Sequence, residues 1–491
     1  MKRRIATQVL SLMLSAFLII GITACSSEKE PVSTAGSKSS VKTSETGSDA
    51  DTKTNTTDTD DDQSSDDSIS NIIVPHSTAK KSTKQTGNTT RTTNNQAVIN
   101  DFFSSVPKNL SGKTVKILVW WNPSENEVKK MEYFTQKTGI KVKFIQTTLS
   151  KYAQKLSSLI SQGSSPDIAK FMDNDYPAVI MKNYFQPLST GAINLKDKAY
   201  DIETMNHYKW KGKYYGLTIK GGSTCDFFII AYNKIMFKNK GVTTPYDLWK
   251  SGKWNWDTLL STAQAMTNPE AGIYGLTSEY QANYLVQSAG VDPVIVTENR
   301  IVNNCSDPKL LKAWQYINDL EDKYKVLSMT LNLSGFCSGK AAMYLCGNFQ
   351  LQKDGVFATR MTDEWGFAPC PSPAGQKFTA ACTSKLWGFP TGSKNTVASS
   401  YALRYWLDPN YDLSGYETWY SDEVNDFVNW LWDQPKTPSR FQGIVDYGGN
   451  YSWAKMTSQL ASTNSSGVKS VLDSWSSVID ANIDKIMAEF G

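Results

Sequence analysis

Histidine is almost missing from this chain of 491 residues, which contains only His76 and His207. A zinc site of the common type needs several histidine or cysteine ligands at close spacing, and a Ser-His-Asp or Cys-His nucleophile needs a well-placed histidine. The sequence also contains no GxxxxGK[ST] phosphate loop, no GxGxxG and no GxSxG motif. We therefore expect no cofactor, no metal ion and no histidine-based catalysis.

An excess of one charge is also missing, since 51 basic residues stand against 47 acidic ones and the formal net charge is +4. Nucleic-acid binding needs a clustered basic face, so we expect no nucleic-acid partner.

Large apolar residues are nearly absent from Ser26 to about Asn95, where Ser, Thr, Asp and Lys dominate. Such a segment cannot bury enough apolar surface to offset its ordering entropy. We predict a disordered tether over residues 25–99, with an end-to-end distance of roughly 45–50 Å.

The apolar run that leads to Cys25 carries the features of an export signal. Basic residues at positions 2–4 precede it, and small residues stand just before the cysteine. The run is too short for a membrane helix, which needs ~20 residues. The residues at 22–25 (ITAC) resemble a bacterial lipobox, in which the thiol is lipidated and becomes the mature N-terminus. This predicts a signal peptide at 1–24 and an acylated Cys25 that anchors the protein at the extracytoplasmic face of the cell membrane. The alternative is an ordinary cleaved signal with a chance cysteine.

Six further cysteines lie in the rest of the chain, at positions 225, 305, 337, 346, 370 and 382. An even number outside the membrane permits disulfides, but the spacing is not that of a dense framework. Cys370 and Cys382 flank a segment rich in Pro and Gly and form the candidate pair. Free buried thiols, which pack as small apolar groups, are the simpler interpretation.

About 390 residues follow the tether, more than one hydrophobic core usually serves, so we expect two domains. Strand patterns at 115–121, 140–145 and 168–172 alternate with helical patterns at 125–138 and 152–161. This order predicts an α/β fold with a parallel sheet, whose ligands bind beyond the carboxyl ends of the strands. The residues expected at those ends are Trp120, Trp121, Asn122, Phe171, Asp173 and Asn174.

Aromatic residues are plentiful, with 15 Trp and 23 Tyr. Their apolar faces and polar tips suit ligands such as sugars, which have C–H faces and polar edges, although an aromatic-rich core is the alternative. Asp173 and Asn174 also suit a helix cap at residues 175–177. Of the neighbours Trp120 and Trp121, one is expected to face the core and the other the ligand, because side chains alternate along a strand.

From Lys113 to Gly491, six sequence motifs follow one another in an order that resembles the family 1 extracellular solute-binding proteins. These are the maltose-binding-like receptors of sugar-importing ABC transporters. The motifs are TGIKV at 138–142, GSSPDI at 163–168, WKGKYYGL at 210–217, AYNK at 231–234, FCSGKAAM at 336–343 with GNF at 347–349, and WGFAP at 365–369. The chain departs from the family at Phe349, where a tryptophan is usual, and at Trp387, where a glycine-rich stretch is usual.

The resemblance implies two α/β lobes around a ligand cleft, joined by a hinge: a periplasmic-binding-protein-like (type II) fold. Lobe one would hold residues 112–219 and 371–415, and lobe two residues 220–368 and 416–491. Matching positions add Asp226, Asn348, Phe349, Trp387 and Trp453 to the expected ligand-binding residues. For Asp226 the alternative is a hinge salt bridge, and for Phe349 and Trp453 it is core packing.

The predicted function is that of a monomeric, lipid-anchored receptor that binds a carbohydrate, expected to be an oligosaccharide, and delivers it to the permease subunits of an ABC importer. It performs no chemistry. A secreted carbohydrate-active hydrolase is the alternative from another class, since paired carboxylates between aromatic walls also describe glycosidase clefts. Asp173 and Asp226 would be its carboxylates. A surface protein that feeds a sugar sensor or grips a polymer is a third alternative.

Overall fold

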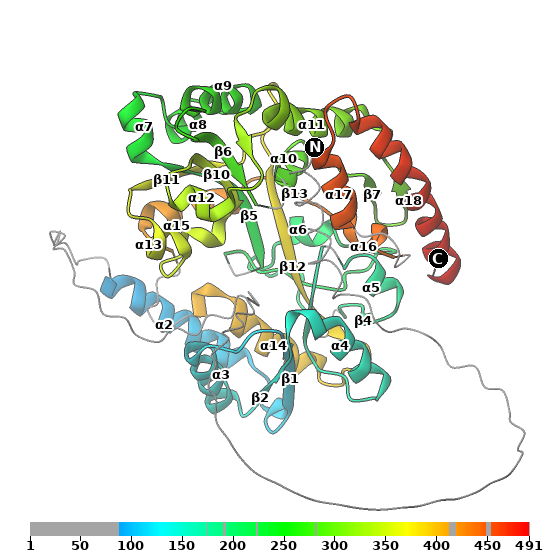
Figure 1. Cartoon of the computed structure of the whole chain (residues 1–491). Helices are drawn as coiled ribbons and strands as arrows, with labels where there is room; N and C mark the ends of the chain where they lie inside the picture. The colour runs from blue at the N-terminus through cyan, green and yellow to red at the C-terminus, as the bar shows by residue number, and fades with distance from the viewer. Residues whose placement is uncertain are drawn as a thin grey trace, which may run out of the picture. The chain divides into compact units, whose positions relative to one another are not determined.

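The computed structural model describes residues 88–173, 175–189, 193–221, 224–279, 282–411, 419–447 and 453–490. By contacts, the chain divides into two units, Met1–Thr86 and Gly87–Gly491, and all the described residues belong to the second (Figure 1). The predicted signal peptide, Cys25 and most of the predicted tether lie outside the described residues. Among the described helices, none is both long enough and apolar enough to span a membrane.

The folded unit contains both helices and strands, as Figure 1 shows. The α-helices are α2 (Asn88–Ser105), α3 (Glu125–Thr138), α4 (Tyr152–Ser161), α5 (Ala178–Met181), α6 (Ile202–Asn206), α7 (Lys234–Lys240), α8 (Pro245–Lys250), α9 (Trp256–Met266), α10 (Asn283–Ser288), α11 (Pro308–Asn318), α12 (Asn332–Cys337), α13 (Val356–Arg360), α14 (Thr396–Leu407), α15 (Asp422–Trp432), α16 (Gln442–Val445), α17 (Trp453–Ser462) and α18 (Val468–Phe490). The strands are β1 (Thr114–Val119), β2 (Lys141–Gln146), β3 (Ala169–Met172), β4 (Phe185–Gln186), β5 (Cys225–Asn233), β6 (Tyr274–Ser278), β7 (Val294–Val296), β8 (Ile301–Asn303), β9 (Leu327–Ser328), β10 (Ala341–Gly347), β11 (Trp365–Pro369), β12 (Ala380–Pro390) and β13 (Lys436–Pro438). Short 3₁₀ turns include η5 (Asn348–Leu351) and η6 (Pro409–Tyr411).

The first part of the unit has the strand–helix–strand order that the sequence predicts. β1 pairs with β2 in parallel, and the backbone N–H of Leu118 donates to the carbonyl oxygen of Ile168 just before β3. Ser124 caps α3 in a capping box with Glu127, and Gly139 ends it with a φ of 73° that favours glycine. The predicted α/β fold class is confirmed.

The long strand β12 joins two sets of strands. Its first residues pair with β5 and β13, whereas its last residues pair with β3 and β4. On its other edge β5 pairs with β10, which pairs in turn with β6. One continuous strand therefore connects the β1–β3 region with the large sheet around β5 (Figure 1).

Among the described residues, buried side chains form three hydrophobic clusters. The β1 cluster contains side chains of β1, α3 and α14, such as Phe134 and Leu403. The β5 cluster contains side chains of β5, β10 and α15, such as Tyr344 and Phe427. The third and largest cluster includes side chains of α9, α11 and α18. The exact lobe boundaries given above remain a prediction.

Helix α2 corrects the predicted end of the tether. It begins at Asn88, within the stretch predicted to be disordered up to residue 99 and well before the predicted start of the body at 112. Ile99, Phe102 and Val106 are buried in the β1 cluster. Their spacing of three and four residues is typical of one face of a helix. The polar residues around them give the segment the composition of a disordered chain, and the helix was therefore not predicted.

The alternative disulfide between Cys370 and Cys382 is wrong, because both cysteines are free and buried. Cys370 belongs to the third cluster and Cys382 to the β5 cluster, so the two thiols pack into different parts of the core. Each of the six cysteines that the structure describes is free, and all but Cys337 are buried. Their thiols therefore act as small core groups.

Candidate functional site

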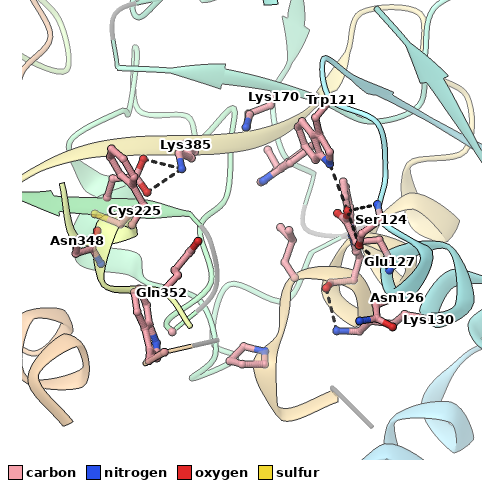
Figure 2. A pocket seen from close by; sticks show the side chains of 18 of the residues that line it. Trp121, Ser124, Asn126, Glu127, Lys130, Lys170, Cys225, Asn348, Gln352 and Lys385 are labelled. Atoms are coloured by element: carbon pink, nitrogen blue, oxygen red, sulfur yellow. Dashed lines mark hydrogen bonds and ion pairs between the residues drawn. The ribbon is translucent and has the colours of Figure 1, made fainter. Parts of the chain in front are cut away.

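A cavity of about 810 Å³ opens between elements of the β1 cluster and elements of the β5 cluster (Figure 2). Its lining combines indole and phenyl rings with charged and amide side chains. The lining residues are Trp121, Ser124, Asn126, Glu127, Lys130, Lys170, Gly221, Cys225, Asp226, Asn348, Phe349, Gln352, Asp354, Lys385, Trp387, Trp406, Leu407, Pro409, Trp419 and Trp432.

One wall is built by the end of β1, the first turns of α3 and the end of α14. The Glu127 carboxylate accepts hydrogen bonds from the Ser124 backbone N–H (2.9 Å) and from the Trp121 Nε1 (3.4 Å). The Trp121 ring also stacks on Trp406, with centroids 6.2 Å apart and planes at 25°. The Lys130 Nζ donates to the Trp406 carbonyl oxygen at 3.0 Å. The polar groups of this wall are therefore held in place by the helix cap and by α14.

The opposite wall contains a short segment that follows β10. The Asn348 Oδ1 accepts from the Phe227 backbone N–H at 3.0 Å, which ties the turn to β5. The Phe349 ring lies against Gly347, where an added Cβ would overlap it. This explains why glycine precedes the turn. Phe349 remains 38% exposed, a large fraction for a phenylalanine, and presents its ring to the cavity.

An ion pair links β5 and β12 beside this wall. The Lys385 Nζ lies 2.7 Å from the Asp226 Oδ2, and it also donates to Oδ1 at 2.8 Å. Asp226 is paired with Thr383 across the antiparallel strands, so Lys385 is its diagonal neighbour. Both side chains are partly exposed to the cavity. Asp226 therefore forms a salt bridge, and the same carboxylate lines the cavity.

The ammonium of Lys170, on β3, lies among three indole rings. Its Nζ is 3.6 Å from the centroid of Trp120, 4.8 Å from Trp121 and 5.4 Å from Trp387. Trp387 stands directly across from Lys170 in the β3–β12 pairing. Burial lowers the Lys170 pKa to about 7, with a further lowering by Lys385 and an opposing effect of Asp226 and Glu127. In Figure 2 the Lys170 and Trp121 side chains lie close together.

The cavity brings together part of the set of residues that the sequence predicts. Trp121, Asp226, Asn348, Phe349 and Trp387 line it. Trp120 contacts the Lys170 ammonium without being a lining residue. Trp121, rather than Trp120, is therefore the member of the pair that faces the cavity.

The remaining predicted residues are placed elsewhere. Phe171 is a core residue that is 2% exposed and packs on Phe185. The Asp173 carboxylate accepts from the Ser384 backbone N–H, and Asn122 accepts from Gln146. Trp453 begins α17 and packs on the third cluster. None of these four lines the cavity: Phe171 and Asp173 are buried in the core, Asn122 is exposed outside the lining, and Trp453 lies on α17. Asn174 lies outside the described residues.

Sequence reasoning missed most of the charged lining, including Glu127, Lys130, Lys170 and Lys385. A lysine within the apolar run 168–172 was a usable signal, because lysine is rarely buried without a reason. His207 is not a lining residue, and burial lowers its pKa to about 4. Among the residues that the structure describes, no group of His, Cys, Asp and Glu side chains is arranged to hold a metal ion.

The family described as bacterial extracellular solute-binding protein matches residues 129–422. The sequence has no significant match among curated proteins. Several solved structures are similar in fold. An ABC substrate-binding protein from Listeria monocytogenes, in complex with cycloalternan, is 17% identical with a TM-score of 0.54, over 77% of this chain and 98% of that one.

Two further structures give the same picture. An extracellular solute-binding protein from Staphylococcus aureus, in complex with maltose, is 15% identical with a TM-score of 0.59, over 77% of this chain and 99% of that one. The other is the galacto-N-biose/lacto-N-biose I-binding protein of an ABC transporter from Bifidobacterium longum, in complex with lacto-N-biose. It is 15% identical with a TM-score of 0.56, over 76% of this chain and 98% of that one. At these identities, the likeness concerns the fold.

Proposed function

Since the chain belongs to the bacterial extracellular solute-binding protein family, we propose that its cavity binds a carbohydrate, in oligomeric form, for uptake by an ABC importer. The observation that carries this proposal is the cavity between the β1 and β5 clusters. At about 810 Å³ it lies in the upper part of the ~300–1,000 Å³ range of ligand pockets. That size suits more than one sugar unit.

The chemistry of the lining supports a sugar ligand. The exposed Phe349 ring offers an apolar face for the C–H side of a pyranose, and the Asp226 carboxylate and Gln352 amide offer partners for hydroxyl groups. The similar structures named above were solved with cycloalternan, maltose and lacto-N-biose. These ligands belong to those proteins, and they support the same ligand class here.

The chain is a binding protein and not an enzyme, because its family is non-catalytic. This removes the hydrolase alternative. The positions of the two candidate carboxylates agree, since Asp226 lines the cavity whereas Asp173 is buried and accepts a hydrogen bond from the Ser384 backbone. The two carboxylates do not face a common bond in the cavity.

The family is extracellular, and the lipobox-like residues 22–25 support attachment to the membrane through acyl chains on Cys25. In this proposal the polar segment after Cys25 is a tether that lets the folded unit reach its ligand and the permease. Ligand contacts to both walls of the cavity would favour a closed form, by as much as the ligand prefers that form over the open one.

A thermal-shift assay with a panel of mono- and oligosaccharides tests the proposal. A ligand that binds only the folded state adds RT ln(1 + [L]/Kd), which is ~2.7 kcal/mol at a hundredfold excess over Kd. We expect at least one neutral or acidic oligosaccharide to raise the melting temperature of the full chain, with no product formed on long incubation.

Asp226→Ala should remove most of that shift. Its ligand-free melting temperature should fall as well, because Lys385 loses its partner in a largely buried pair, so the ligand-induced shift is measured from the variant's own ligand-free value. As a matched control, Asp473→Ala breaks an exposed ion pair on α18, far in sequence from the cavity lining, and should keep the full ligand shift. If no sugar shifts the melt while a peptide or metal ion does, the proposed ligand class is wrong.

A further inference from the structure

The charged side chains around the cavity differ in how they are neutralised. Lys385 and Asp226 pair with each other, Glu127 accepts hydrogen bonds in the cap of α3, and Lys130 donates to backbone carbonyls of the α14 end. Asp354 also has a partner within the protein. Lys170 is different.

Within the described part of the chain, the Lys170 Nζ makes its contacts with the rings of Trp120, Trp121 and Trp387. Indole faces attract a cation, so the cage holds the ammonium group in place. The indoles carry no formal negative charge. Asp226 and Glu127 act on the ammonium electrostatically, but among the described residues neither forms an ion pair with it, and burying a cation without such a pair is costly. The Lys170 side chain nevertheless lines the cavity, so a ligand in the cavity can approach it.

The tryptophan cage also limits what Trp121 and Trp387 can do for a ligand. The face of Trp120 is occupied by the ammonium, and Trp121 packs on Trp406 with its ring. The exposed Phe349 on the opposite wall remains open to stack on a sugar, and the partly exposed Trp419 also lines the cavity. The two walls offer different chemistry: an exposed apolar ring on one side and, on the other, a caged lysine that forms no ion pair among the described residues.

We propose that Lys170 binds an anionic substituent of the ligand, so that the cavity prefers acidic sugars over neutral ones. This inference rests on the proposed carbohydrate function and names the class of sugar. A uronate carboxylate and a sulfate ester share the required chemistry, namely an oxygen anion that accepts a charged hydrogen bond. Asp226 would then serve the hydroxyl groups of the same ligand.

The pH dependence of binding follows from the charges that face Lys170. Lys385 and burial disfavour its protonated form, whereas Asp226 on β5 and Glu127 on α3 favour it, and the Lys170 pKa in the free protein is about 7. A bound anion stabilises the ammonium and raises this pKa. The affinity for an acidic sugar should therefore be full below pH 7 and fall above it, by up to about tenfold per pH unit. The affinity for a neutral sugar should not follow this profile.

The test compares di- and trigalacturonate and di- and triglucuronate with their methyl esters, which keep the skeleton and remove the charge. A sulfated disaccharide forms a separate arm that distinguishes a carboxylate from a sulfate ligand. Binding to the full chain is measured by titration calorimetry between pH 6 and pH 9. We expect an acidic probe to bind at least tenfold more tightly than its ester at pH 6.5.

Lys170→Met removes the charge while keeping an unbranched side chain among the indoles. It should weaken the acidic probe by about 10- to 150-fold, the worth of a charged hydrogen bond, and abolish the pH profile. The methyl ester should bind this variant as it binds the parent. Lys182→Met is the matched control, because Lys182 contacts the Tyr447 ring outside the cavity lining, and its binding should equal that of the parent.

The outcomes separate this inference from the proposed function. If esters or neutral sugars bind at least as tightly as the acids, or if Lys170→Met leaves acid binding unchanged, the preference for acidic sugars is refuted while carbohydrate binding stands. If no sugar of either kind binds, both are refuted. If Lys170→Met does not fold, the pH profile of the parent decides, since an acid affinity that stays flat from pH 6 to pH 9 refutes the inference.

Discussion

Replacing Phe349 by alanine should weaken ligand binding and leave the fold nearly intact. The ring is 38% exposed, so about 75 Å² of a phenylalanine's roughly 200 Å² is open to the cavity. Covering that area with ligand contributes at most ~2 kcal/mol at 25 cal/mol per Å². The loss of conformational freedom of the ligand on binding offsets part of this binding free energy. A ring contact adds ~0.5–1.5 kcal/mol. We expect a loss of ~1–3 kcal/mol, which is a rise in Kd of about 5- to 150-fold.

Phe171→Ala is the matched comparison, because the sequence suggested both phenylalanines as ligand contacts. Phe171 is 2% exposed and packs on Phe185 at 4.8 Å between centroids. Its removal should cost ~3–5 kcal/mol of unfolding free energy. The Kd of the surviving folded protein should change little.

Urea unfolding and calorimetric titration of both variants with the best oligosaccharide of the panel measure the two effects. The reasoning is refuted if Phe349→Ala lowers stability as much as Phe171→Ala does. It is equally refuted if Phe349→Ala binds as tightly as the parent.

Two further predictions concern the N-terminal part of the chain. A chain that starts at Asn100 lacks the first turns of α2 and the buried Ile99, so it should unfold at lower urea than one that starts at Gly87. Equal midpoints would show that the part of α2 before Asn100 contributes nothing to the core. Cys25→Ala should move the protein from the membrane fraction to the soluble one if Cys25 carries the acyl anchor, and continued sedimentation with carbonate-washed membranes would contradict that role.

Local patterns were enough to predict the first part of the fold. The alternation of β-rich and amphipathic segments between residues 114 and 172 follows from side-chain period and helix caps, which are properties of neighbouring residues. The boundary at α2 was missed because two properties compete there. The composition of residues 26–95 is polar and predicts disorder. The apolar face that indicates a helix consists of only a few residues, among them Ile99 and Phe102.

The site was predicted only in part, for a different reason. The strand-end rule selects Trp121, which lines the cavity, but it also selects Phe171 and Asp173, which are buried in the core. Whether a strand-end residue reaches the cavity depends on β12, whose contact with β3 joins residues more than 200 positions apart. The partner of Asp226 and the indole cage of Lys170 arise from the same long-range pairing. This pairing between distant strands cannot be predicted from patterns among neighbouring residues.

The course of β12 also bears on how such a site can change in evolution. Lys385 and Trp387 lie two residues apart on one strand, and both line the cavity. A one-residue insertion or deletion within β12, ahead of Lys385, would turn both side chains to the opposite face and shift the register of the strand against β3 or β5. A lineage can therefore alter these positions only by substitution. Phe349, in contrast, lies outside the strand pairing and is 38% exposed, so it can be substituted without disturbing the sheet. New ligand preferences should accordingly arise in descendants first around Phe349 and only later along β12.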